Sequence, residues 1–337
     1  MIERPAPQIR SDRDVRLQVA SVGVCGSDVH YYAEGRIGSQ VIRYPFVVGH
    51  ECSAVVLETG PAVVRVKPGD RVAVEPAISC GECDQCRAGR RHTCRLLRFL
   101  GCPGQLEGCL CEQIVMPEDC CYPIPAAMTL DRAALVEPLS IGIYAARMAA
   151  LRPGAPFAVL GAGPIGLCVL TAALAEGAGT AYVTEPIGPR RDVAQSLGAG
   201  WSADPYAADP VSDILAREPL LFDAVFECAG QPEALDLGVR LLKPGGTLLV
   251  IGIPRTDRVS FDIDRLRRRE ICIRNVRRQN ECVEPAIRLA AARPERVDRL
   301  QTHVFALDRC GEAFDLVANY RDGVVKAMIR VSEAPCR

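Results

Sequence analysis

The sequence lacks an excess of either charge. Its 337 residues carry 40 basic and 41 acidic side chains, which gives a formal net charge of −1. Proteins that hold nucleic acid through counterion release usually show a clear basic excess. The balance therefore argues against a nucleic-acid partner and favours a small molecule.

A secretory leader and a membrane span are also lacking. The start, residues 1–14, is charged and rich in proline, without the apolar core of a signal peptide. Residues 157–175 are uncharged, but three glycines and a proline interrupt them early, which argues against a continuous spanning helix. Seventeen cysteines without a leader are typical of a reduced protein that binds metal. We expect a cytoplasmic protein that does not contact a membrane.

Internal repeats and low-complexity tracts are absent, and the length suits about two domains. The first half is strand-like between glycine and proline breaks, as at residues 15–23, 53–60 and 67–76. From about residue 156, short apolar runs alternate with helix-compatible segments. That alternation builds a parallel, doubly wound sheet. The sequence therefore predicts an α/β chain in which a nucleotide-binding domain interrupts or follows a β-rich domain.

The run VLGAGPIG predicts a phosphate-binding turn. Gly161, Gly163 and Gly166 form G-x-G-x-x-G between an apolar strand and an apolar helix. Glu185 ends the next strand, where a carboxylate can accept hydrogen bonds from a ribose 2′-hydroxyl and repel a 2′-phosphate. The pattern predicts a dinucleotide site that favours NAD, a preference that Arg190 and Arg191 could soften.

Four cysteines in the stretch CGECDQCRAGRRHTC predict a structural zinc. Cys80, Cys83, Cys86 and Cys94 follow C-x2-C-x2-C-x7-C, and four thiolates leave no coordination position for a substrate. His92 lies inside this loop and could replace a cysteine, although a solvent-facing or supporting role fits better.

A second set of ligands predicts a catalytic zinc. Cys25, His50 and Glu51 offer one thiolate, one imidazole and one carboxylate, which together neutralise Zn²⁺. Glu137 is a fourth polar residue in an apolar run. As a permanent ligand it would make the site negative, so we expect it to contact a zinc-bound water or the substrate, or to ligate transiently. Two zinc ions per chain follow from the two sets.

The motifs together resemble the zinc-dependent medium-chain dehydrogenase/reductase family, in its sorbitol (polyol) dehydrogenase-like branch. The resemblance runs from VGVCGSDVHYYAEGRIG through YPFVVGHE, the cysteine loop, LVEPLSIG, GAGPIG and FECAG to VRRQN. It implies a GroES-like catalytic domain at residues 1–140, a Rossmann NAD-binding domain at 141–274, and a segment at 275–337 that returns to the catalytic domain. It also implies a homodimer or homotetramer.

The resemblance assigns roles residue by residue. It implies that Cys25, His50 and Glu51 ligate catalytic zinc and that Glu137 contacts zinc water or polyol. Ser27 and His30 match positions that pass the alcohol proton to solvent, and Tyr31 and Arg277 match positions that reach the substrate. The positions implied to touch NAD are Ile165, Glu185, Arg190, Ile251, Gly252, Ile253, Asn275 and Val276.

Some positions depart from the family pattern. Arg278 stands where a second tyrosine is common, so it joins the predicted substrate-binding residues and could hold a carboxylate. Glu185 replaces the commoner aspartate. Cys52 follows the His-Glu pair as a possible soft ligand, although packing fits it better. The family usually has more β structure before the strand at residue 15.

The expected reaction is oxidation of a secondary hydroxyl of a sorbitol- or xylitol-like polyol to a ketone, with hydride transfer to NAD. Threonine, 2,3-butanediol or an aldonate such as idonate are alternative substrates within the same chemistry. A zinc-loop binding protein without catalysis is the alternative from another class.

Overall fold

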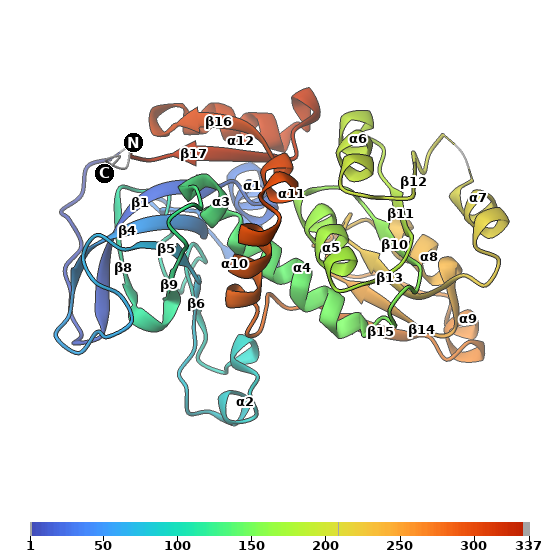
Figure 1. Cartoon of the computed structure of the whole chain (residues 1–337), viewed down its shortest axis with the longest axis horizontal. Helices are drawn as coiled ribbons and strands as arrows, with labels where there is room; N and C mark the ends of the chain where they lie inside the picture. The colour runs from blue at the N-terminus through green and yellow to red at the C-terminus, as the bar shows by residue number, and fades with distance from the viewer. Residues whose placement is uncertain (1, 208, 333–337) are drawn as a thin grey trace. The chain divides into compact units, whose positions relative to one another are not determined.

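The computed structural model describes residues 2–207 and 209–332 and divides the chain into two compact units. Unit 1 comprises Met1–Glu137 and Val283–Arg337, and unit 2 comprises Pro138–Cys282. Unit 1 is thus built from both ends of the chain, and unit 2 from its middle (Figure 1). The boundaries predicted from the sequence follow residues 140 and 274.

Unit 1 is organised around a seven-stranded mixed sheet in the order β16-β17-β1-β4-β5-β9, with β8 paired to β1. Strand β1 is antiparallel to β4, β8 and β17, whereas β16 and β17 are parallel. Alternate side chains of β1, Val15, Leu17 and Val19, are fully buried, as period-two patterning requires. The strands are β1 (Asp14–Gly23), β4 (Glu51–Thr59), β5 (Arg71–Val74), β8 (Gln113–Pro117), β9 (Cys121–Pro123), β16 (Gln301–Ala306) and β17 (Lys326–Arg330).

Short hairpins and helices surround this sheet. The two-residue strands pair as β2 (Arg36–Ile37) with β3 (Gln40–Val41), and β6 (Ala77–Ile78) with β7 (Arg98–Phe99). The helices are α1 (Gly26–Glu34), α2 (Asp84–Arg87), α3 (Leu130–Ala134), α10 (Val283–Ala292), α11 (Pro294–Val297) and α12 (Cys310–Ala318). Single 3-10 turns are η1 (Arg91–Thr93), η2 (Glu118–Cys120), η3 (Asp298–Leu300), η4 (Leu307–Arg309) and η5 (Arg321–Gly323).

Unit 2 contains a six-stranded parallel sheet in the order β12-β11-β10-β13-β14-β15. Numbered within the unit this is 3-2-1-4-5-6, the order of a dinucleotide-binding doubly wound fold. The strands are β10 (Phe157–Leu160), β11 (Ala181–Thr184), β12 (Trp201–Ala203), β13 (Phe222–Glu227), β14 (Leu242–Val250) and β15 (Cys272–Asn275). The helices are α5 (Pro164–Ala175), α6 (Gly188–Ser196), α7 (Pro210–Arg217), α8 (Pro232–Leu241) and α9 (Ile263–Arg268), and α4 (Val136–Ala149) contains the boundary between the units.

The predicted α/β class and both domain types are confirmed. Helix α8 ends at Leu241, because the nearby Pro244 cannot donate a helical hydrogen bond and Gly245 adopts a φ of 78°. The uncharged stretch at 157–175 forms β10, a turn and α5, as predicted. None of the helices in the described ranges is long and apolar enough to cross a membrane.

Candidate active site and metal centres

The four cysteines of the loop at 80–94 converge in unit 1. Cys80 Sγ lies 3.4 Å from Cys94 Sγ and 3.9 Å from Cys86 Sγ. Cys83 Sγ lies 3.6 Å from Cys86 Sγ and 3.9 Å from Cys94 Sγ. A tetrahedron with Zn–S bonds of about 2.3 Å has edges of about 3.8 Å. The donor set and its spacing therefore fit a zinc held by four sulfurs.

The loop's own backbone favours thiolates at two of these positions. Amide groups of Arg95 and Cys86 lower the pKa of Cys83 to about 6, and those of Glu82 and Cys83 lower the pKa of Cys80. Burial and neighbouring sulfurs raise the pKa of Cys86 to about 11. His92 is buried, which contradicts the solvent-facing alternative but not the supporting one, and it is not part of the group of candidate ligands.

A second group of possible metal ligands lies in the same unit. Ligand atoms of Cys25, His50 and Glu51 lie within 4.8 Å of one another. Cys25 caps α1, His50 precedes β4, and Glu51 is the first residue of β4. Gly23 pairs with Glu51 across β1 and β4, and a Cβ at Gly23 would collide with the Glu51 carboxylate. Thiolate, imidazole and carboxylate at this spacing fit a zinc that keeps an open position.

Helix α1 carries further polar side chains, and two of them, Ser27 and Asp28, lie beside this group. Ser27 Oγ lies 3.3 Å from Cys25 Sγ, and His30 Nδ1 lies 3.4 Å from Glu34 Oε1. Asp28 is buried, accepts a hydrogen bond from the Gly49 amide, and lies 3.4 Å from His50 Nδ1. A carboxylate on one ring nitrogen orients a histidine and leaves the other nitrogen for a metal.

The role of Asp28 beside His50 was not predicted from the sequence. Burial favours a neutral imidazole, but Asp28 and Cys25 outweigh it and raise the pKa of His50 well above its usual value. A carboxylate three residues after a helix-capping cysteine, in a segment that also carries metal ligands, is the signal that could have identified it.

Lys326 was also missed, and it contacts Glu51 directly. Its Nζ donates to Glu51 Oε1 at 2.8 Å, to Glu51 Oε2 at 2.7 Å and to the Val24 carbonyl at 3.1 Å. Both side chains are at most 2% exposed. Because 275 residues separate the partners, no local sequence pattern reveals the pair.

Glu137 is buried in unit 1 among charged neighbours. Burial, together with Glu51 and Glu75, raises its pKa to about 8, against the opposing effect of His50 and Lys326. Its proximity to His50 and Glu51 is consistent with a role beside the metal ligands. Cys52 packs in the hydrophobic core of the sheet, as expected, and is not part of the ligand group.

Tyr31, the predicted substrate residue on α1, is 4% exposed and hydrogen-bonded. Its hydroxyl donates to Gln40 Oε1 at 3.1 Å, and Gln40 Nε2 donates to Cys102 Sγ at 2.9 Å. The Phe99 ring lies 5.2 Å from the His50 ring, centroid to centroid. Gln40 and Cys102 were not singled out from sequence.

In unit 2, the glycine turn follows β10 as predicted. Gly161 has a φ of 98°, which favours glycine, and a Cβ at Gly166 would collide with the Gly161 carbonyl oxygen. A Cβ at Gly163 would meet only Arg190 Nη1, at 3.8 Å. Gly163 caps the N-terminus of α5, so backbone N–H groups are available there for a pyrophosphate. The cradle fits a dinucleotide.

Glu185 follows β11 and faces this turn. Its Oε2 accepts from the Ala162 amide at 2.8 Å, and its Oε1 accepts from the Ile187 amide at 3.0 Å. Arg191 donates to the Glu185 and Pro186 carbonyls, and Arg190 is buried on α6. A carboxylate oxygen has a second lone pair, so Glu185 can still accept from a ribose hydroxyl.

The remaining predicted cofactor residues lie at the carboxyl edge of the same sheet, where doubly wound folds bind ligands. Ile251, Gly252 and Ile253 follow β14, whereas Asn275 ends β15 and Val276 follows it. Ile165 lies in the first turn of α5. Arg277 is exposed and Arg278 has a φ of 55°. Their roles toward substrate stay predictions.

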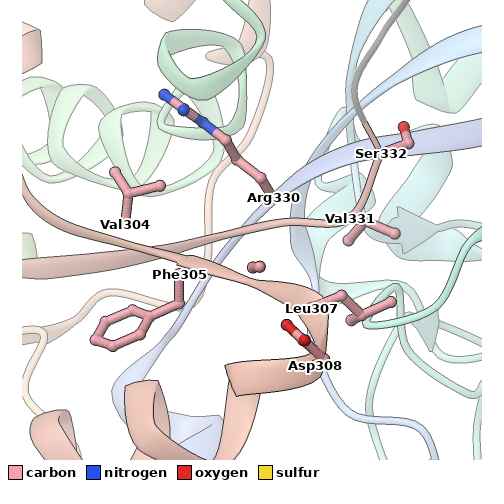
Figure 2. Close-up of a pocket in the computed structure, with 8 residues that line it drawn as sticks. Val304, Phe305, Leu307, Asp308, Arg330, Val331 and Ser332 are labelled. Atoms are coloured by element: carbon pink, nitrogen blue, oxygen red, sulfur yellow. The ribbon is translucent and has the colours of Figure 1, made fainter.

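A cavity of about 550 Å³ opens beside β16 and β17 in unit 1 (Figure 2). Its lining contains none of the predicted site residues, so it is separate from both candidate metal centres. The residues that line it are Val304, Phe305, Ala306, Leu307, Asp308, Arg330, Val331 and Ser332.

The chain matches two family models and is similar to several known dehydrogenases. Residues 11–126 match the family model "Alcohol dehydrogenase GroES-like domain", and residues 164–292 match "Zinc-binding dehydrogenase". The chain is 34% identical to sorbitol dehydrogenase of Bacillus subtilis, over 96% of this chain and 92% of that protein.

Solved structures agree with the fold. A zinc-binding dehydrogenase of Sinorhizobium meliloti bound to NADP is 30% identical, with a TM-score of 0.86 over 98% of this chain and 94% of that one. An alcohol dehydrogenase of Escherichia coli complexed with NADH is 26% identical, with a TM-score of 0.88 over 98% and 95%.

Proposed function

Because the chain belongs to the zinc-dependent medium-chain dehydrogenase/reductase family, we propose that it oxidises a secondary hydroxyl of a sorbitol- or xylitol-like polyol to a ketone, with NAD as hydride acceptor. The observation that carries the proposal is the joint presence of a three-ligand group with one thiolate, one imidazole and one carboxylate, and an intact dinucleotide cradle. Likeness to sorbitol dehydrogenase along nearly the whole chain supports the polyol as substrate.

The side chains of the candidate site divide into those that hold the metal and those that move the proton of the hydroxyl. When bound, zinc lowers the pKa of the hydroxyl to be oxidised and NAD accepts the hydride. Cys25, His50 and Glu51 hold the catalytic metal, and Asp28 fixes the His50 ring. Ser27, 3.3 Å from Cys25 Sγ, accepts the hydroxyl proton and His30 passes it to solvent.

The polar side chains among the proposed substrate-binding residues favour a substrate with several hydroxyls. Tyr31, Glu137, Arg277 and Arg278 are the proposed substrate-binding residues. Each additional hydroxyl of a polyol can form a hydrogen bond worth about 0.5–1.5 kcal/mol with such a side chain, and a simple alcohol has no second hydroxyl to offer. A polyol therefore reacts better than 2-propanol.

NAD is preferred to NADP because the Glu185 carboxylate stands at the end of β11, facing the glycine turn. We further propose a homodimer or homotetramer in the cytoplasm. Its small-molecule substrate and cofactor need no nucleic-acid or membrane partner.

A substrate panel tests the proposal. The panel holds sorbitol, xylitol, galactitol, L-idonate, L-threonine, 2,3-butanediol and 2-propanol, each with NAD and with NADP on the zinc-loaded protein. Sorbitol or xylitol should give the highest kcat/KM. A highest kcat/KM for threonine, 2,3-butanediol or 2-propanol would refute the polyol assignment, and one for L-idonate would establish the aldonate alternative. Failure to bind NADH, seen by nucleotide fluorescence, would instead support a zinc-loop binding protein without catalysis.

A further inference from the structure

Beside the candidate catalytic ligands, three side chains from three segments of unit 1 form a chain of hydrogen bonds. Tyr31 comes from α1, Gln40 from β3, and Cys102 from the segment after β7. The Tyr31 hydroxyl donates to Gln40 Oε1 at 3.1 Å, and Gln40 Nε2 donates to Cys102 Sγ at 2.9 Å. Tyr31 and Cys102 are each 4% exposed, whereas Gln40 is half-buried.

This chain of hydrogen bonds lies next to the metal ligands. Cys25 caps the helix that carries Tyr31, and Phe99, whose ring lies against His50, precedes Cys102 by three residues. Burial and the neighbouring Cys102 and Asp28 raise the pKa of Tyr31, whereas His50 opposes the rise. Asp28, which lies 3.4 Å from His50 Nδ1, is three residues before Tyr31 on α1, so the two side chains share the face of the helix that contacts His50.

Hydrogen-bond polarity follows from this arrangement. A tyrosine hydroxyl has a single proton to donate and lone pairs that accept. Gln40 accepts that hydrogen bond through its carbonyl oxygen, and its amide nitrogen donates to Cys102 Sγ. Toward any further ligand, Tyr31 is left with its acceptor capacity.

We propose that Gln40 is a positioning residue that makes Tyr31 a hydrogen-bond acceptor, so that the substrate group bound against Tyr31 is a neutral hydroxyl. A carboxylate or phosphate at that place brings no proton, and its lone pairs would face those of Tyr31. The inference rests on the proposed oxidation of a polyol and deepens it, since it selects neutral polyols over sugar acids and sugar phosphates.

Two substitutions at Gln40 test the inference with opposite expectations. In Gln40→Met the carbonyl acceptor is lost and the Tyr31 proton becomes available to an anion. The ratio of kcat/KM for sorbitol to kcat/KM for L-idonate should fall about two- to tenfold, the effect of one ordinary hydrogen bond. Gln40→Glu keeps an acceptor oxygen for Tyr31, so the ratio should stay or rise.

A matched control and a binding measurement complete the experiment. Gln113→Met makes the same change in β8, where Gln113 bonds Arg16 and Gln18, and should leave the ratio unchanged. The dissociation constant of the ketose product from the zinc-loaded, NADH-bound protein should rise in Gln40→Met, with zinc content and NADH affinity as in the parent.

The outcomes separate this inference from the proposed function. An unchanged sorbitol-to-idonate ratio in Gln40→Met, or an equal loss on both substrates in Gln40→Met and Gln40→Glu, overturns the role of Gln40 while polyol oxidation stands. Absence of turnover of every polyhydroxylated substrate by the parent protein refutes the proposed function, and the inference falls with it.

Discussion

Replacing Lys326 by methionine should show whether Glu51 is only the ion-pair partner of Lys326 or also a ligand of the metal. The ammonium of Lys326 donates hydrogen bonds to three buried acceptors, which are both carboxylate oxygens of Glu51 and the Val24 carbonyl oxygen. Removing one partner of a buried ion pair costs about 3–5 kcal/mol, because the other charge stays buried without compensation. We therefore expect Lys326→Met to lower the unfolding free energy of the metal-free protein by about that amount.

Zinc should reduce this cost if Glu51 is a ligand. A bound metal compensates the Glu51 charge itself, so the metal-loaded variant should lose about 2 kcal/mol less than the metal-free one. By linkage, that difference appears as catalytic-site zinc affinity about thirtyfold higher in the variant. The affinity of the four-cysteine site should not change, since its ligands lie elsewhere in unit 1.

Denaturant unfolding and competition with a chromophoric chelator measure the two quantities. Trp201, the single tryptophan, lies in unit 2, so its fluorescence reports that unit while circular dichroism reports both. Lys243→Met is the matched control, because Lys243 pairs with Asp223 at a partly exposed site where an ion pair contributes about 0–1 kcal/mol. Equal destabilisation with and without zinc, with both zinc affinities unchanged, would show that Glu51 remains paired to Lys326 and does not ligate the metal.

Three further predictions follow from the described sites. Elemental analysis of the parent should find two zinc ions per chain; Cys83→Ser should lose one together with stability but retain residual turnover, whereas His50→Ala should lose the other and all turnover while remaining folded. Glu185→Ser should narrow the preference for NAD over NADP by about 1–3 kcal/mol in kcat/KM, and equal use of both cofactors by the parent would contradict this reasoning. Glu118 accepts from the Val64 and Arg65 amides and pairs with Arg13, which keeps its pKa below the usual 4.5. Its stabilising effect is thus complete above pH 4.5 and lost as pH falls through the folded pKa, so the unfolding free energies of Glu118→Ala and the parent should differ at pH 7 and converge in acid; a constant difference would argue against the charge.

Local motifs could be predicted from sequence because their ligands are close in the chain. The cysteine loop spans fifteen residues, and the glycine turn lies between one strand and the next helix. Strand β12 was not expected, because its three residues are all half-buried and show no alternation between buried and exposed positions. The parallel, doubly wound sheet was predicted from the other strands, whose apolar runs alternate with helix-compatible segments, whereas the strand order comes from the structure.

Tertiary partners of the site could not be predicted in this way. Lys326 and Glu51 are in contact although all of unit 2 lies between them in the sequence. Gln40 and Cys102 are in contact at a sequence separation of 62 residues. Neither pair has a spacing that a local pattern can recognise. Asp28 differs from these pairs, since it lies only three residues after the candidate ligand Cys25 in the sequence.

Construction of unit 1 from both ends of the chain has a consequence for the order of folding. Unit 2 is continuous from Pro138 to Cys282, so all its strands have left the ribosome while β17 is still unmade. Residues Ser21 to Gly23 of β1 pair with Arg330 to Met328 of β17, and Lys326 brings the only ammonium that contacts Glu51 in the described residues. During synthesis, we therefore expect the dinucleotide-binding unit to fold first and the catalytic metal site to be completed last.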